Sequence, residues 1–426
     1  MNRHGSERGA TDQTHGRAQR SRPGELAFVA AGLAVYIALA VVKMRGYALD
    51  GRFWAEEGSM FYADFHGRSL PGRLLYLVYG HFMLAANLVV AASMLVPLKL
   101  APLVTTWLSL AIQSIPVVLI AAWYERLGLT RFTACAVVLV MLGLPQAPEV
   151  WANAVNLHFH FSLVAAIIAA ARIDRAYPRW TGRALLGLSG LSGVPANFLL
   201  PVFLALAAVT RERERWIHCG ILGTTAAIQL LLLATHSGST GGRTVSFDPR
   251  FYWLPILAQQ VLSPLLGMKM GEGFATILRR VPQNDADALL FALVCSIPVA
   301  CVFAAAWRAR SLTLWTLLAA SLTLVLLSIL GSIGDKASFI SAAGGGRYFY
   351  VPNVLLAMFL FSAFSGSRRL LPRVLITVLL MGSLVRVPSS AKGPEWLAAY
   401  DRAMAQRAGE IDIWPTGWKM RNVLLE

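Results

Sequence analysis

Long apolar runs dominate the chain and set its fold class. From residue 26 to residue 385 they recur at lengths of about 15 to 25 residues, separated by short polar connections. The runs show no strict alternation of apolar and polar positions, and hydrocarbon offers backbone groups no hydrogen-bond partner, so helices are favoured over barrel strands. The predicted fold is an all-α polytopic membrane protein with about 10 to 11 transmembrane helices over residues 23–386.

Short arginine-rich connections indicate which side of the membrane is cytoplasmic. The strongest of them, at residues 172–183, carries four arginines. Placing all such connections on one side puts the N-terminus in the cytoplasm. It leaves a first external loop at 43–76, a long external loop at 235–287 and an external tail at 387–426, whose aromatic residues predict that it packs back onto this face.

Three apolar stretches depart from simple spans. Residues 70–95 contain glycines and polar residues, and both a spanning helix and a surface helix fit them. Residues 184–208 are interrupted by Gly and Pro and meet arginines at both ends, which predicts a helical hairpin with an outward turn. Residues 251–266 are aromatic and partly apolar, so a second surface helix is expected there.

Composition and charge narrow the choice of partners. The chain has 426 residues, of which 56% are hydrophobic and 14% charged, and a formal net charge of +16. Much of that charge lies between apolar runs, where cytoplasmic connections of a membrane protein carry arginine and lysine. The charge therefore predicts contact with membrane lipid and no nucleic-acid partner. Residues 1–22 are polar and basic and predict a disordered cytoplasmic tail. The four cysteines show no spacing typical of a disulfide framework or a zinc site.

Two adjacent acids follow the first predicted span. Glu56 and Glu57 stand between aromatic residues in the first external loop. Adjacent residues cannot share one helix face, so at most one of them faces a reacting group. A carboxylate near a like charge and partly removed from water has a raised pKa and accepts a proton near neutral pH. The pair predicts a general base. The alternative is that both are solvated loop acids or acids that cap a helix.

A polar segment begins at Glu149. Asn153, Asn156 and His160 recur in it at helical spacings, and in a helix they would present hydrogen-bonding groups on one side. The tripeptide His-Phe-His within the segment also has the form of a metal pair. No matching acids or cysteines lie nearby, so interfacial hydrogen bonding to a substrate is favoured and no metal is predicted.

Three cations on the predicted external side are candidate phosphate ligands: Arg243, Lys336 and Arg347. Glycines let backbone amides approach a phosphate, and a following arginine can bind it through two hydrogen bonds. The alternative for each is an interface anchor; Arg347 with Tyr348 at a predicted helix start is the best candidate. No Walker motif, dinucleotide fingerprint or nucleophile elbow occurs in a usable context, so energy and leaving group come from elsewhere.

The order of these parts resembles the GT-C superfamily of membrane glycosyltransferases, which includes protein O-mannosyltransferases and oligosaccharyltransferases. The resemblance covers most of the chain as a layout of short motifs. Its parts are a first span, Trp54-Ala55-Glu56-Glu57-Gly58 in the first external loop, a surface-helix candidate at 71–95, an external segment with Glu149, Asn153 and Asn156, the hairpin around 188–195, and Arg347-Tyr348 before a late span.

The resemblance implies an enzyme of the bacterial inner membrane that moves a sugar from a polyprenyl-phosphate donor to a hydroxyl of a cell-surface glycan or a lipid-linked acceptor. Glu57 would be the base, with Glu56 second; many relatives have Asp there, so Glu-Glu leaves the assignment between them open. Arg347, Lys336 or Arg243 would hold the donor phosphate, and Trp54 and Tyr348 join the polar segment as candidate substrate contacts. No cofactor is implied, and a divalent cation is left open.

A different class of protein fits the same sequence. A transporter, flippase or polymerase of lipid-linked glycans would share the phosphate-binding cations but would not need a base at Glu57. The inverted repeats common in secondary transporters are not visible in the sequence.

Overall fold

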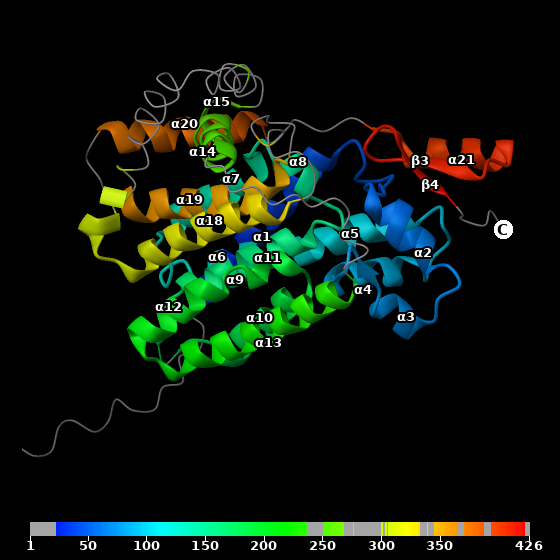
Figure 1. The fold of residues 1–426 in the computed structure, drawn as a ribbon. Helices are drawn as coiled ribbons and strands as arrows, with labels where there is room; N and C mark the ends of the chain where they lie inside the picture. The colour runs from blue at the N-terminus through cyan, green and yellow to red at the C-terminus, as the bar shows by residue number, and fades with distance from the viewer. Residues whose placement is uncertain are drawn as a thin grey trace, which may run out of the picture.

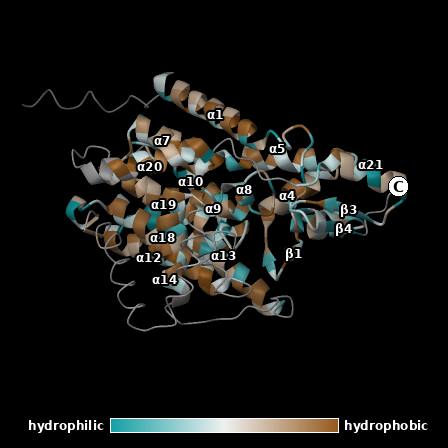
Figure 2. Cartoon of the chain, turned by 90° about the horizontal axis from the view of Figure 1, so that it is seen from above, coloured by the Kyte–Doolittle hydropathy of each residue, from teal (hydrophilic) through white to brown (hydrophobic). Residues whose placement is uncertain are grey.

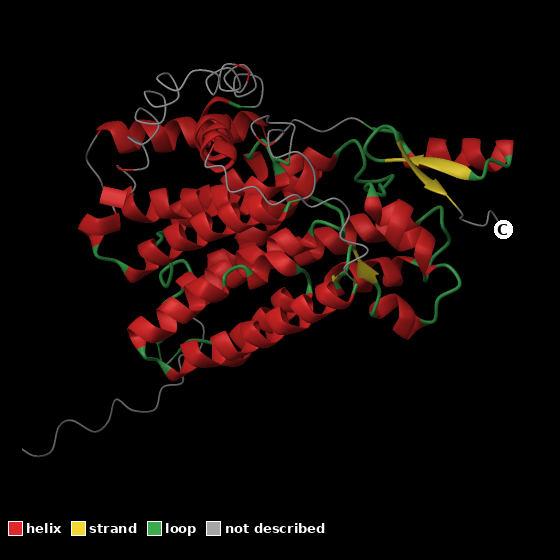
Figure 3. Ribbon diagram, in the orientation of Figure 1, coloured by secondary structure: helices red, strands yellow, loops and turns green. Residues whose placement is uncertain are grey.

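The computed structural model describes residues 23–174, 176–236, 250–267, 276, 300, 303–304, 306–332, 339, 345–364, 370–386 and 393–421. Helices make up most of this part of the chain (Figure 3). The bundle helices are α1 (Pro23–Met44), α5 (Ala101–Gln113), α6 (Ile115–Ala122), α7 (Arg131–Gly143), α8 (Ala147–Val150), α9 (Leu157–Ala170), α10 (Arg179–Leu191), α11 (Val194–Asn197), α12 (Leu200–Thr210), α13 (Arg213–Thr235), α14 (Arg250–Ile256), α15 (Ser263–Leu266), α18 (Leu312–Gly331), α19 (Arg347–Phe364) and α20 (Leu370–Arg386).

Five described segments are long and apolar enough to cross a membrane: Gly24–Met44, Ala101–Ala122, Arg213–Thr235, Leu312–Gly331 and Arg347–Phe364. Shorter apolar helices stand between them along the chain, including α7, α9 and α20. These helices confirm the prediction of an all-α membrane protein. The expected number of spans stays a prediction.

The helix α9 is buried among other helices. It packs against α6, α10, α18 and α19, and its residues from Phe159 to Ala170 are buried. The outer helices instead expose large apolar side chains, for example Leu26 on α1, Leu230 on α13 and Val385 on α20. Apolar residues cover much of the bundle in Figure 2. Exposed apolar surface of this extent fits a bundle surrounded by lipid.

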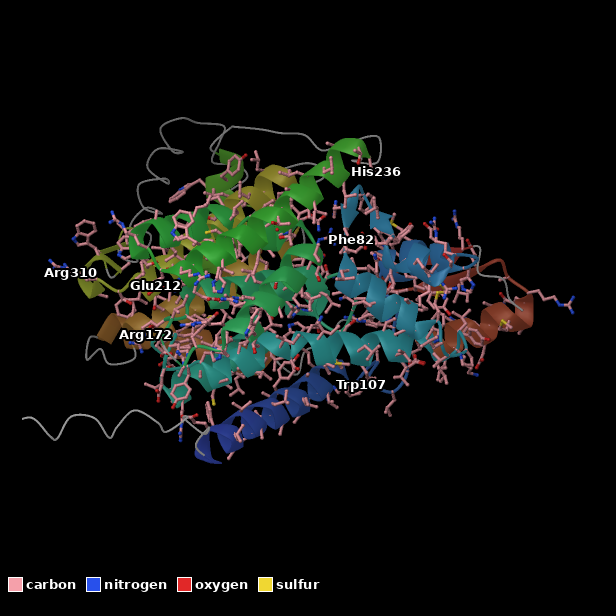
Figure 4. All side chains as sticks on the ribbon, turned by 90° about the horizontal axis from the view of Figure 1, so that it is seen from below. Phe82, Trp107, Arg172, Glu212, His236 and Arg310 are labelled. Carbon is pink, nitrogen blue, oxygen red and sulfur yellow. The ribbon has the colours of Figure 1, made fainter. Side chains whose placement is uncertain are left out.

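The short arginine-rich turns share one end of the bundle, which we call the arginine end. The start of α1 lies there, because Phe28 packs on Tyr124 with ring centroids 5.6 Å apart. Arg126 in the next turn pairs with Asp174 at 2.5 Å. Figure 4 shows Arg172, Glu212 and Arg310 toward this end, and Phe82 and His236 away from it. The described turns lie together, as predicted; the turn at 365–369 lies outside the described residues.

The opposite end, which we call the loop end, carries short elements from the first loop and from the tail (Figure 1). The first loop forms a π-helical turn (Glu57–Tyr62), α2 (Ala63–Phe65), α3 (Leu70–Leu74), β1 (Leu77–Val78), β2 (His81–Phe82) and α4 (Leu84–Ser93). Residues 70–95 are therefore split into pieces too short to span as one helix. Residues 184–208 form the predicted hairpin, with α10 and α11 on either side of Gly193 at φ 143°.

The tail packs onto the first loop, as its aromatic residues predicted. It forms α21 (Trp396–Gln406) and an antiparallel pair, β3 (Glu410–Ile413) with β4 (Trp418–Arg421). The Asp50 carboxylate accepts hydrogen bonds from the N–H groups of Trp396 (2.6 Å) and Leu397 (2.9 Å), which caps α21. The Trp414 N–H donates to the Phe53 carbonyl at 3.0 Å. The first loop and the C-terminal tail are thus joined at the loop end.

Candidate functional site

Glu57, the first candidate base, is completely buried and bound on both carboxylate oxygens. Oε2 accepts from the Trp54 N–H at 2.9 Å, and Oε1 accepts from the Ala154 N–H at 2.7 Å. Burial raises the pKa of Glu57 to about 7, against the lowering effect of these two bonds, of Arg52 and of Thr105. The side chain fastens the first loop to the polar segment that follows Glu149. A substrate has no direct access to it.

Glu56 lies in a different environment from its neighbour. It is partly exposed, and its buried oxygen Oε2 has no hydrogen-bond partner in the described part of the chain. Its charge acts on Arg347, Glu149 and Tyr79. The turn that aims Glu57 inward therefore aims Glu56 toward other candidate site residues. The two acids therefore lie in different surroundings, as expected for adjacent residues on a turn.

Arg347 and Glu149 form an ion pair beside Glu56. Arg347 Nη1 lies 3.3 Å from Glu149 Oε1, and the side chains are 31% and 32% exposed. The Arg347 backbone N–H, at the start of α19, also donates to the Glu149 carboxylate. Burial raises the pKa of Glu149, Arg347 lowers it and Glu56 raises it. The result is a guanidinium paired with one carboxylate and within electrostatic range of a second, close to solvent and to a helix start.

Asn153 and Asn156 position Glu149 and are buried themselves. Their side-chain N–H groups donate to the Glu149 carbonyl at 3.0 Å and 2.9 Å. Arg52 supports the same segment, because its Nη2 donates to the Trp151 carbonyl at 2.6 Å. The structure thus places the two asparagines behind the site, as backbone supports, where sequence spacing had suggested substrate contacts.

Trp54 belongs to an aromatic cage around the buried guanidinium of Arg52. The guanidinium carbon lies 4.0 Å from the ring centroid of Tyr47, 4.7 Å from that of Trp54 and 5.0 Å from that of Trp414. Stacking of a desolvated guanidinium on aromatic faces is favourable, and here it joins the first loop to the tail. The structure assigns Trp54 to this cage rather than to a surface that a substrate would meet.

The hairpin of β1 and β2 brings a further residue to the site that sequence reasoning did not select. Tyr79 occupies the turn with φ 50°, followed by Gly80 at φ 76°. Burial raises the pKa of Tyr79, Glu56 raises it further and Arg347 lowers it, so its hydroxyl lies within electrostatic range of both charges. In the sequence Tyr79 only interrupts an apolar stretch. The one local signal for it was the Tyr-Gly turn itself.

The remaining predicted residues divide into three groups. His160 is buried, with its ring 5.0 Å from Trp151 and 5.5 Å from Tyr350. Tyr348 is partly exposed and packs on Phe159 at 5.8 Å. Arg243 and Lys336 lie outside the described residues. Within the described ranges, no group of three or more His, Cys, Asp or Glu residues could hold a metal ion.

Comparisons with known protein families, with characterised proteins and with solved structures gave no match to this chain. The class of protein that the fold defines is a helical membrane protein. The candidate site at its loop end consists of Glu56, Glu149, Arg347 and Tyr79.

Proposed function

We propose that the protein is a membrane glycosyltransferase. It moves a sugar from a polyprenyl-phosphate donor to a hydroxyl of a cell-surface glycan or lipid-linked acceptor, at the outer face of a bacterial inner membrane. The observation that supports this proposal best is the grouping of Glu56, Arg347 and Glu149 at the loop end, away from the arginine-rich turns. It combines a carboxylate able to take a proton with a cation able to meet a phosphate, on a protein embedded in lipid.

In the proposed reaction, Glu56 accepts the proton of the acceptor hydroxyl. The hydroxyl oxygen forms a bond to the anomeric carbon while the bond from that carbon to the phosphate oxygen breaks, most simply with inversion. The electron pair of the broken bond stays on the phosphate, and Arg347 stabilises its charge. Glu149 holds the guanidinium in place before the donor arrives. No nucleotide is needed.

Glu56 replaces Glu57 as the favoured base for a geometric reason. A general base must reach the proton it removes, directly or through one water. Both oxygens of Glu57 are occupied by backbone N–H groups in a buried position, whereas Glu56 is partly exposed and has an unpartnered oxygen. Glu57 keeps a supporting role, because it holds the turn from which Glu56 projects.

The test compares isosteric variants in membranes supplied with polyprenyl-phosphate hexoses and pentoses labelled in the sugar. We expect Glu56→Gln to reduce transfer by at least about a hundredfold, the usual contribution of a general base, with donor binding retained. Asp401→Asn is the matched control, because Asp401 is an exposed acid on α21, and it should transfer at the original rate. Full transfer by Glu56→Gln would overturn the assignment of the base.

The same experiment separates an enzyme from a transporter, flippase or polymerase of lipid-linked glycans. A flippase would bind the donor through Arg347 but would release it chemically unchanged on the other side. If labelled donor crosses the membrane intact in both the original protein and Glu56→Gln, and no labelled acceptor forms in either, the enzyme proposal fails.

A further inference from the structure

The first turns of α10 and α13 form a surface at the arginine end that has no role in the proposed reaction. We call it the α10–α13 patch, and it consists of Arg179, Trp180, Arg213 and Trp216, all exposed. Figure 1 shows α10 beside α13, and the two helices pack on each other. The side chain of Trp180 is 79% exposed and that of Trp216 is 51% exposed. Indoles exposed to this extent usually mark a contact with a partner or with lipid.

A bidentate ion pair fixes the two halves of the patch to each other. Arg183, one turn after Arg179 on α10, donates from Nε and Nη2 to the two carboxylate oxygens of Glu214, at 2.9 Å and 2.7 Å. Glu214 directly follows Arg213, so this ion pair holds Arg179 and Arg213 on adjacent helix turns. The Arg183 guanidinium carbon also lies 4.7 Å from the ring centroid of Trp180. Direct contacts between α10 and α13 therefore build the patch.

The acids next to the patch are engaged by other cations. The Glu214 side chain is 7% exposed beneath its ion pair, and Glu212 Oε2 lies 3.6 Å from Arg215 Nε. In the part of the chain that the structure describes, neither acid forms an ion pair with Arg179 or Arg213. Both of these guanidinium groups are exposed, so the patch presents positive charge to its surroundings.

The exposed residues change in character along the neighbouring helices. On α13, Leu230 and Leu231 are each 65% exposed, whereas the start of the same helix exposes the patch. On α12, Val209 is 72% exposed and is followed by the exposed Arg211 in the turn to α13. An apolar surface that gives way to indoles and arginines matches the change from hydrocarbon to headgroups in a bilayer.

We propose that the α10–α13 patch binds the headgroups of anionic phospholipids. Arg179 and Arg213 donate to the phosphate oxygens, and the indoles of Trp180 and Trp216 lie at the level of the headgroups beside them. A free phosphate ion meets only the arginines, whereas a lipid also covers the indoles, so the occupant is a lipid. The patch lies at the end of the bundle opposite to Glu56, and this inference does not depend on the proposed function.

The test uses the full chain purified in a neutral maltoside detergent. Native mass spectrometry measures the dissociation constant of the first lipid bound, for phosphatidylglycerol, which is anionic, and for phosphatidylcholine, which carries phosphate but no net charge. We expect phosphatidylglycerol to bind about tenfold more tightly. Arg179→Gln and Arg213→Gln should each weaken its binding about fivefold, and the double variant about 25-fold, because a cation near an anionic lipid surface contributes about 1 kcal/mol.

The matched control is Arg402→Gln, since Arg402 is an exposed arginine on α21 at the loop end. It should change binding by less than about twofold, the effect of a solvated surface charge. Unchanged binding of phosphatidylglycerol in the double variant, or equal affinity for the two lipids, would overturn the proposal. Displacement of the lipid by an equal concentration of inorganic phosphate would do the same, because the ion alone would then fill the site. Each single variant reports separately, so a folding defect in one leaves the other to decide.

Discussion

Glu56 and Glu57 show how far one backbone turn can separate two identical side chains. The Glu57 carboxylate satisfies two N–H groups that come from positions 54 and 154, so it acts as a polar joint inside the loop end. Glu56 remains within electrostatic range of Arg347 and Tyr79. Removing Glu57 should therefore change stability first, while removing Glu56 should change chemistry first.

Replacing Glu57 tests its structural role. Glu57→Ala leaves the N–H groups of Trp54 and Ala154 buried without acceptors, so we expect a loss of about 2–5 kcal/mol in the free energy of unfolding. Denaturant unfolding of the purified protein measures this loss. Asp401→Ala, at an exposed acid, should change the free energy by less than about 0.5 kcal/mol. An unchanged stability in Glu57→Ala would contradict the structural role.

The pH dependence of stability follows from the same residue. Its pKa rises from 4.5 to about 7 on folding, so the folded protein binds this proton more tightly than the unfolded chain. The stabilisation is fully present below pH 4.5 and is lost as the pH rises to about 7. Thermal unfolding across this range should show the decline, and Glu57→Gln should lack this part of it. Parallel curves for both proteins would disprove the assignment.

At the scale of elements, one side chain of α13 holds the hairpin that carries Tyr79. The Phe82 N–H donates to Gln229 Oε1 at 3.0 Å, and Gln229 Nε2 donates back to the Phe82 carbonyl at 2.9 Å. Gln229 Nε2 also donates to the Gly190 carbonyl at 3.2 Å. The position of the hairpin relative to the bundle thus depends strongly on a single amide.

Gln229→Met should loosen this hairpin without unfolding the bundle. Loss of both bonds to Phe82 is expected to speed amide hydrogen exchange at residues 77–82 by about tenfold, the effect of about one kcal/mol or more in local opening. Thr224→Val is the control, because Thr224 is exposed on the same helix and bonds only to Gly220 one turn earlier. Equal exchange in the two variants would show that other contacts hold the hairpin.

The sequence predicted long helices well and the small elements poorly. Apolar runs such as 312–330 reappear as α18, because length and hydropathy alone determine whether a helix suits lipid. The hairpin at 77–82 was missed, since strands of two residues have no periodicity to detect. Asn153 and Asn156 were recognised as important from their spacing, but which way they face depends on Glu149 and on contacts from distant helices.

At the scale of the whole molecule, the separation of the two ends predicts the orientation in the membrane. If the arginine end is cytoplasmic, single cysteine reporters in the described turns should differ in access. Arg172→Cys should react with a membrane-impermeant maleimide only after cells are lysed, whereas Asp401→Cys should react in intact spheroplasts. Both reporters are to be made in a chain without its native cysteines. Labelling of both in intact spheroplasts would contradict this orientation.

On this larger scale the sequence also predicted that the residues of the proposed site lie on the same side of the membrane. These residues lie about 90 to 290 residues apart along the chain, and only the rule that arginine-rich turns share one side brought them together. The rule says nothing about which acid faces which cation. That detail depends on the Glu57 bonds, on the cage around Arg52 and on the packing of the tail, none of which leaves a local pattern.

The packing of the tail against the first loop has a consequence for biosynthesis. Trp396 and Trp414 complete contacts with Asp50 and Arg52, which leave the ribosome several hundred residues earlier. The first loop therefore cannot make these contacts until nearly the whole polypeptide has been synthesised. A nascent chain released before residue 396 would carry every helix of the bundle and still lack the tail contacts to Asp50 and Arg52.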